Sequence, residues 1–317
     1  MASVCAWLGT GATLPLFLIG LPILGGLIVW LLKKHFVAQF VSVLVFGFAN
    51  LFLCLALYLG GGVTVSLPFA GYGFEANFVS SGLSAVLPLF SSVVALLLAG
   101  YSATYYRGKK EGGLFLLFFF VSVAFVNGAL LSDNLPVMLV FWEGLLISMS
   151  VLLLIGNLQK PRAVIKMLWI SGVADLMLML GVIITIHVSG QSNISAITRL
   201  PVEGVGAAGC VLMLLGALGK AGAVPFHSWI PLAAEDAQSP FLALFPASFE
   251  KILGIGLAIR IVTQIYDVQP GSAVSTFVMI VGAATLFIGV AMALIQKDMK
   301  KLLSYHAISQ VGYMILG

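Results

Sequence analysis

The sequence predicts an all-α membrane protein with about ten transmembrane helices. Hydrophobic residues make up 61% of its 317 residues and charged residues only 8%, against about 25% charged residues in an average soluble domain. Charge-free stretches such as 36–74, 76–106 and 268–296 exceed the roughly 20 apolar residues that cross the hydrocarbon core of a bilayer. Because backbone groups in lipid need hydrogen-bond partners within the protein, we expect these stretches to be helices.

A transmembrane β-barrel is excluded by the pattern of the apolar segments. Barrel strands alternate in polarity, whereas Leu114–Val121 is apolar at every position. A signal peptide is also not expected at the N-terminus, because no basic region precedes the first apolar stretch and Lys33 and Lys34 follow it. We interpret that stretch as the first transmembrane helix.

Charged and turn-forming residues separate the expected spans. These lie near 12–32, 36–59, 82–105, 113–131, 134–156, 164–187, 205–234, 240–265, 273–295 and 302–317. The Gly-rich segment 60–81 between the second and third spans predicts an extracytoplasmic loop or hairpin.

The distribution of basic residues predicts the orientation of the chain. Eleven of the 15 lysines and arginines follow odd-numbered spans: Lys33, Lys34, Arg107, Lys109, Lys110, Lys160, Arg162, Lys166, Lys297, Lys300 and Lys301. By the positive-inside rule these loops are cytoplasmic, so we expect a multi-pass protein of the cell membrane with an extracytoplasmic N-terminus. The net charge of +4 then reflects topology, and no nucleic-acid partner is expected because no basic face with exposed aromatics is encoded.

The sequence encodes no recognisable cofactor or metal site. Cys5, Cys54 and Cys210 are isolated, without the spacing of a zinc site or an iron–sulfur cluster. No P-loop, dinucleotide fingerprint or hydrolytic pair of carboxylates is present either. We therefore expect no cofactor in this chain.

Four ionisable residues fall well inside expected spans: Glu143, Asp175, Lys220 and Lys251, with Glu250 beside the last. A charge at mid-bilayer costs about 2.5–3.5 kcal/mol even on lenient scales, and such residues usually mark ion pathways. The alternative is an ion pair that only locks helices together. Two acids and two lysines on four different helices favour the pathway.

The expected span around Lys220 carries helix-breaking residues. Pro225 and Pro231 follow the lysine closely, and proline removes a backbone donor and clashes with the preceding turn. A helix broken at membrane depth is tolerated where it lines a watery cavity. His227 lies on this segment, and His306 lies on the last span; each is a candidate proton relay, or a hydrogen-bonded structural histidine.

Three long motifs carry a family resemblance. They are SDNLPVMLVFWEGLLI at 132–147, GALGKAGAVPFHSWIPLAAEDAQSP at 216–240 and IQKDMKKLLSYHAISQVGYMILG at 295–317. The sequence over roughly 80–317 resembles the antiporter-like subunits of respiratory complex I, energy-converting hydrogenases and multi-subunit sodium/proton antiporters. The WEGLL, EKILGI and SYH elements resemble the hydrogenase branch most.

The resemblance implies roles for the buried charges. Glu143 resembles the glutamate on the fifth helix of the family, Asp175 an acid on the sixth, Lys220 the lysine on the broken seventh, and Lys251 a lysine on the eighth. These residues would form a proton-translocation path in which a switchable Glu143–Lys220 pair passes a proton towards Lys251. Pro246 stands where many members have a histidine, which argues against a relay step at that depth.

The resemblance also implies a domain organisation. Family members have about fourteen helices in two inverted repeats, whereas this sequence stops inside the tenth. We expect N-terminal helices and the extracytoplasmic loop at 1–111, a complete first antiporter-like repeat at 112–265 with a broken helix near 220–231, and the start of a truncated second repeat at 266–317. The second half would then belong to a longer chain or to a separate polypeptide.

The implied function is proton or sodium translocation by a non-catalytic membrane subunit of a redox-driven pump, such as an energy-converting hydrogenase or a complex I-like assembly. Expected partners are other membrane subunits, including a second antiporter half or a neighbouring antiporter-like subunit, with soluble redox subunits acting indirectly. One alternative is a subunit of a secondary Na⁺/H⁺ antiporter or bicarbonate-uptake system without a redox partner. Another is a structural membrane scaffold.

The orientation can be tested by cysteine labelling. Because the positive-inside rule places Lys109, Lys160 and Lys300 in the cytoplasm, cysteines at these positions should resist an impermeant thiol reagent in intact cells. Cysteines at Arg199 and Asp267 should react. Labelling of the Lys109→Cys variant from outside would overturn the orientation.

Overall fold

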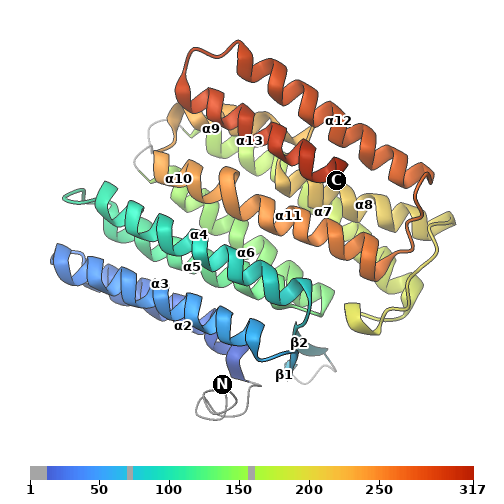
Figure 1. Ribbon diagram of the computed structural model, residues 1–317, viewed down its shortest axis with the longest axis horizontal. Helices are drawn as coiled ribbons and strands as arrows, with labels where there is room; N and C mark the ends of the chain where they lie inside the picture. The colour runs from blue at the N-terminus through green and yellow to red at the C-terminus, as the bar shows by residue number, and fades with distance from the viewer. Residues whose placement is uncertain (1–12, 70–73, 156–160) are drawn as a thin grey trace. The chain divides into compact units, whose positions relative to one another are not determined.

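The computed structural model describes residues 13–69, 74–155 and 161–317 (Figure 1). The chain forms two compact units, Met1–Ile155 and Gly156–Gly317. Nine helices in the described residues are long and apolar enough to cross a bilayer, which confirms the all-α membrane class. Lys160 and Cys5 lie outside the described residues.

The described residues of the first unit form a bundle of five helices with one β-hairpin. Its elements are α2 (Leu14–Leu31), α3 (Phe36–Leu59), β1 (Val63–Phe69), β2 (Phe74–Ser80), α4 (Leu83–Tyr105), α5 (Gly112–Leu131) and α6 (Leu135–Leu154). Helix α5 packs against α2, α4 and α6 and is the most buried of the five. Asn127 on α5 ties this core together, because its side chain donates to the Leu18 carbonyl at 2.9 Å and to the Asn50 side chain at 3.0 Å.

Residues 60–81 were expected to form a loop or a hairpin, and the structure shows a hairpin. Strands β1 and β2 pair antiparallel, with Val63 opposite Ser80. The β-branched residues at the start of β1 favour an extended strand. The Asp133 N–H donates to the Asn77 carbonyl at 2.8 Å, so the hairpin is fastened to the segment that precedes α6.

The second unit contains the remaining helices. These are α7 (Arg162–Ser189), η2 (Ile194–Ala196), α8 (Gly204–Ala221), η3 (Phe226–Ser228), α9 (Trp229–Asp236), α10 (Ser239–Leu244), η4 (Phe245–Phe249), α11 (Glu250–Arg260), η5 (Ile261–Ile265), α12 (Ala273–Leu294) and α13 (Met299–Leu316). Helix α8 packs between α7 and α11, and α13 packs on α12 and α9. The tenth expected span is α13, which is helical but lies outside the nine membrane-spanning candidates.

Close contact between α7 and α8 depends on glycine. A Cβ atom on Gly181 of α7 would lie 2.6 Å from the Met213 backbone nitrogen, and one on Gly216 of α8 would lie 2.9 Å from the Ala174 carbonyl oxygen. Since lipid tails are as apolar as the side chains, membrane helices associate largely through such close packing of small residues. The glycines therefore bring the charged side chains of α7 and α8 within reach of one another.

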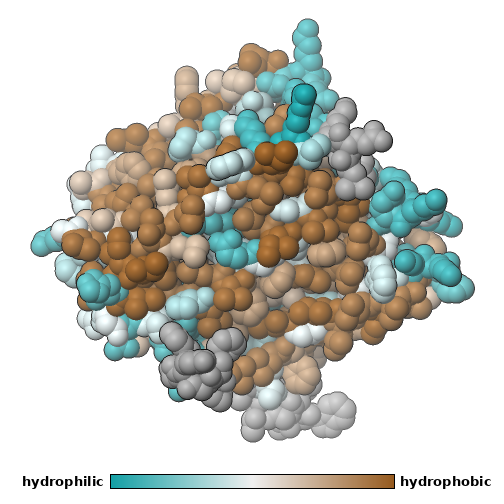
Figure 2. Space-filling model, turned by 180° about the vertical axis from the view of Figure 1, so that it is seen from behind, coloured by the Kyte–Doolittle hydropathy of each residue, from teal (hydrophilic) through white to brown (hydrophobic). Residues whose placement is uncertain are grey.

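The surface of the protein is largely apolar. Hydrophobic side chains cover most of the face shown in Figure 2. Large apolar residues point outwards on several helices, including Trp169 at 72%, Phe287 at 75% and Leu294 at 82% exposure. Because water would penalise so much exposed apolar surface, this surface fits a lipid environment.

The division into units at residue 155 differs from the boundaries expected at 111 and 265. Those boundaries follow inverted repeats, whereas the units follow packing within the chain. The assignment of the repeats stays a prediction.

Substitution of Gly181 tests the packing of α7 on α8. Gly181→Ala should destabilise the protein, because the added methyl meets the backbone of Met213 rather than a movable side chain. Gly172→Ala on the same helix is the matched control, since its Cβ would have nothing within 4 Å. Alanine favours helix over glycine by about 1 kcal/mol, so the control should be neutral or stabilising. Equal midpoints of thermal unfolding for the two variants in detergent would contradict the packing argument.

Candidate functional site

The helix that carries Lys220 is broken where the two prolines predicted. Helix α8 ends at Ala221, and Gly222 takes the left-handed conformation with φ 84° that terminates many helices. The Ala223 N–H donates back to the Leu218 carbonyl at 3.0 Å. The chain then passes a cis Val224–Pro225 bond and a 3₁₀ turn before α9 begins at Trp229.

A threonine on α12 supports the break. The Val224 N–H donates to Thr285 Oγ1 at 3.0 Å, and the Thr285 hydroxyl donates to the Val281 carbonyl at 2.7 Å. A backbone N–H freed from a helix inside a membrane needs such a partner. Sequence reasoning missed Thr285; its only signal was a hydroxyl residue in the middle of the largely apolar 273–295 span.

Lys220 lies in the last turn of α8 and forms an ion pair with Asp175 of α7. The Lys220 Nζ and Asp175 Oδ2 atoms are 3.5 Å apart, and the two side chains are 0% and 3% exposed. Both residues were expected on an ion path, and the structure brings them together. A charge buried this deeply requires a countercharge, which Asp175 supplies to Lys220.

Two further charges lie in the first turn of α11. Glu250 and Lys251 are 1% and 8% exposed, and the Glu250 carboxyl interacts electrostatically with Lys220, Asp175 and Lys251. One turn later, a Cβ on Gly254 would lie 2.5 Å from the Ala217 carbonyl oxygen, so α11 approaches α8 closely here. Asp175, Lys220, Glu250 and Lys251 form what we call the buried charge cluster.

The expected continuous span at 240–265 is interrupted by two π-helical segments. Phe245–Phe249 and Ile261–Ile265 flank α11 on either side. Pro246 lies in the first segment and cannot donate a backbone hydrogen bond, so a wider turn accommodates it. Such π-helical turns are rare in proteins as a whole but recur at functional sites. The first of the two directly precedes Glu250 of the buried charge cluster.

Glu143 lies on α6 in the first unit and is half-buried. The helix begins as the SDNLP motif predicted, with the Asn134 side chain accepting from the Val137 N–H at 3.2 Å and proline in the first turn. Since Glu143 and Lys220 belong to different units, their pairing stays a prediction.

The two histidines occupy different surroundings. His227 lies in the 3₁₀ turn directly after the break, and its Nδ1 atom is buried without a hydrogen-bond partner among the described residues. His306 is exposed on α13 and lies outside the buried charge cluster. Relay roles for both residues stay predictions.

The described residues contain no group of three or more His, Cys, Asp and Glu side chains that could hold a metal ion. Cys54 and Cys210 are buried free thiols.

Comparison with known proteins identifies the family. The family described as "NADH:quinone oxidoreductase/Mrp antiporter, TM" matches residues 132–317. A curated relative, a Na(+)/H(+) antiporter subunit of Alkalihalophilus pseudofirmus, is 28% identical over 307 residues, which cover 93% of this chain and 61% of the relative. The matched region includes every member of the buried charge cluster.

Solved structures share the fold. The Mrp complex from Dietzia sp. contains a chain that matches with a TM-score of 0.80 and 24% identity, covering 96% of this chain and 58% of that one. The membrane-bound sulfane sulfur reductase, an archaeal respiratory complex, matches with a TM-score of 0.81 and 20% identity over 95% of this chain and 64% of that one.

The chain thus spans about three fifths of the length of these similar proteins. The two structures are multi-subunit membrane complexes. Since the matching family covers more than half of the sequence, this multi-pass membrane protein belongs to the NADH:quinone oxidoreductase/Mrp antiporter family of antiporter-like subunits.

Proposed function

We propose that this chain is an ion-translocating subunit of a multi-subunit membrane complex, and that protons or sodium ions move along a path through the buried charge cluster. The observation that carries the proposal is the ion pair between Lys220 and Asp175, which is buried in the last turn before a helix break. Intramembrane charges and broken helices both characterise ion pathways.

The composition of the cluster suits ion transfer. Two acids and two lysines lie together, so the cluster can be neutral overall while each group keeps an opposite charge nearby. Arrival of one proton or cation upsets this balance. The free energy is then lowered when a neighbouring group releases a proton or exchanges partners, which moves charge along the cluster.

Glu143 is proposed as the switch that controls Lys220. Two opposite charges about 4 Å apart attract by roughly 4 kcal/mol at an effective dielectric of about 20. A carboxylate close to Lys220 therefore stabilises the protonated form of the lysine. Withdrawal of that carboxylate favours release of the proton from Lys220. A signal from a neighbouring subunit would move Glu143, and Lys220 would pass its proton towards Lys251.

Two kinds of assembly are candidates for the driving partner. The WEGLL, EKILGI and SYH elements favour a redox-driven pump of the energy-converting hydrogenase type. Similarity to a Na⁺/H⁺ antiporter subunit over 93% of the chain favours a secondary antiporter without a redox partner. Affinity purification of the assembly decides between them, because co-purifying iron–sulfur subunits support the first and their absence the second.

Mutation of the proposed switch tests the mechanism. Glu143→Gln and Lys220→Ala should each reduce ion translocation strongly while the complex still assembles, and the double variant should lose little more than either single one. Ion flux into vesicles containing the complex measures the effect. Coupled residues give non-additive losses, so a double variant that shows the product of the two single losses would refute the switch.

Lys297→Ala is the matched control for Lys220→Ala. Lys297 is exposed in the loop between α12 and α13, outside the cluster. Its removal takes away the same charge and should leave flux unchanged. A loss equal to that of Lys220→Ala would mean that overall charge, rather than the cluster, sets the rate.

The proposed function also predicts how the isolated chain behaves. The family builds its path from two inverted repeats, so a proton on Lys220 or Lys251 needs an acceptor on further helices to leave the membrane. Without one, the remaining hydrocarbon imposes the cost of an isolated charge. In liposomes under a pH gradient, the isolated 317-residue chain should show no coupled flux. Saturable, Lys220-dependent flux would show that this chain holds a complete path.

A further inference from the structure

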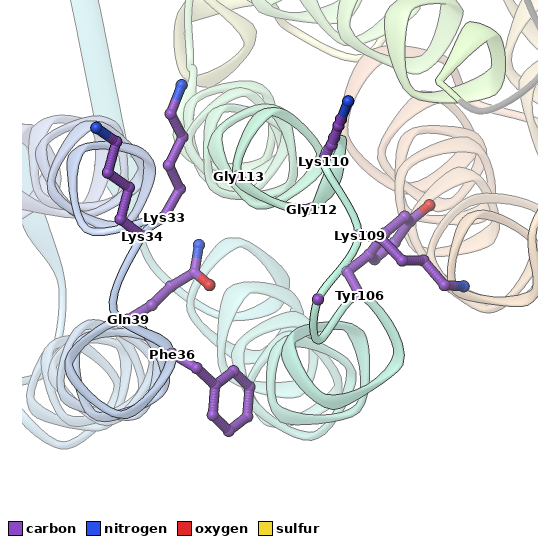
Figure 3. Close-up of a pocket in the computed structure, with 10 residues that line it drawn as sticks. Lys33, Lys34, Phe36, Gln39, Tyr106, Lys109, Lys110, Gly112 and Gly113 are labelled. Carbon is purple, nitrogen blue, oxygen red and sulfur yellow. The ribbon is translucent and has the colours of Figure 1, made fainter.

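The basic end of the first unit contains a cavity that the ion path does not use. It has a volume of about 480 Å³ and lies between the loop joining α2 to α3 and the loop joining α4 to α5. We call it the basic pocket. Its lining residues are Lys33, Lys34, Phe36, Gln39, Tyr106, Gly108, Lys109, Lys110, Gly112 and Gly113 (Figure 3).

The pocket carries a local excess of positive charge. Figure 3 shows Lys33 and Lys34 on one side of the hollow and Lys109 and Lys110 on the other. None of these four lysines forms an ion pair with a carboxylate in the described part of the chain. The positive-inside rule explains why the loops are basic, but it does not require four lysines to surround one cavity.

Aromatic rings position two of the lysines, and a glycine lets the two loops approach each other. Lys33 Nζ lies 4.7 Å from the Trp30 ring centroid, and Lys109 Nζ lies 3.7 Å from that of Tyr105. Such contacts position a cation without neutralising it. A Cβ on Gly113 would lie 2.8 Å from Lys33 Cβ, so the two loops meet closely at this glycine.

Two helix N-termini add to the attraction for an anion. Helices α3 and α5 begin at Phe36 and Gly112, both of which line the pocket. In neither helix does the preceding residue, His35 or Glu111, cap the backbone with its side chain. The first-turn N–H groups and the helix dipoles therefore favour negative charge at this place.

The location of the pocket favours a lipid over a soluble anion. The pocket lies at the ends of four membrane-spanning helices, and the adjoining Leu31 and Val37 side chains are 69% and 74% exposed. A ligand with a phosphate headgroup and acyl chains would match both the lysines and this apolar surface. Basic pockets of this kind at the cytoplasmic side bind anionic headgroups.

We propose that the basic pocket is a binding site for an anionic phospholipid, whose phosphodiester headgroup is attracted by the positive charge of the lysines that line it. The lipid would brace the loops that join α2 to α3 and α4 to α5. This inference uses residues of the first unit alone and does not depend on the proposed ion path.

The experiment compares the binding of two lipids with different headgroups to the purified full chain. Fluorescent phosphatidylglycerol should bind the wild-type protein in detergent, and phosphatidylcholine with the same chains should bind more weakly. Lys34→Gln and Lys110→Gln should each weaken phosphatidylglycerol binding about fivefold, because a basic residue near a membrane surface contributes about that factor. Lys110→Arg, which keeps the positive charge, should bind phosphatidylglycerol as well as the wild-type protein does. Equal affinity for the two lipids would overturn the proposal.

Lys297→Gln is the matched control, since it removes one exposed lysine from a basic loop outside the pocket. It should leave the preference for phosphatidylglycerol intact, whereas a fivefold loss would overturn the pocket as the site. A second arm adds 10 mM inorganic phosphate. Persistence of lipid binding supports a phospholipid site, and full displacement would mean that the pocket takes a soluble phosphate instead.

Discussion

The need to balance Lys220 inside a membrane constrains the second unit more than any other interaction. Asp175 lies 3.5 Å away on α7, and Glu250 interacts with the same lysine from α11. This arrangement requires three helices to approach closely, which Gly181, Gly216 and Gly254 permit. A larger residue at these glycines would separate the helices and leave a buried charge without its partner, which is far more costly than a packing defect.

The same constraint accounts for the irregular backbone around the cluster. Regular helix satisfies its own N–H and C=O groups, so breaks at membrane depth persist only where other groups replace the lost partners. Thr285 does this for Val224, and the π-helical turn at Phe245–Phe249 accommodates Pro246. Both irregularities lie next to the charges, inside the membrane-spanning candidates 204–236 and 239–265. Backbone disruption and buried charge thus occur together, as expected where a path for water or ions enters a bundle.

Much of the fold follows from the sequence because its signals are local. Apolar runs predict the spans, and Pro225 with Pro231 predicts the break. The π-helical segments could not be predicted, because one wide turn shifts the apolar pattern too little to be recognised. The partner of Lys220 could not be predicted either. The sequence places Glu143, Asp175 and Lys220 on membrane helices, but the rotation of each helix decides which carboxylate lies next to the lysine. For the same reason the sequence shows Glu250 only as a neighbour of Lys251.

The geometry of the Lys220–Asp175 pair bears on how the cluster could work. Strong charge-assisted hydrogen bonds between ammonium and carboxylate groups measure about 2.7–2.9 Å, so the separation of 3.5 Å marks a loose pair. A tight pair would trap the ion, since releasing a buried charge from its partner is expensive. In the proposed path, a loose pair with Glu250 as a second acid nearby would let Lys220 exchange partners in small steps. Stability of the buried lysine and mobility of its charge are therefore compatible, because no single carboxylate has to hold it alone.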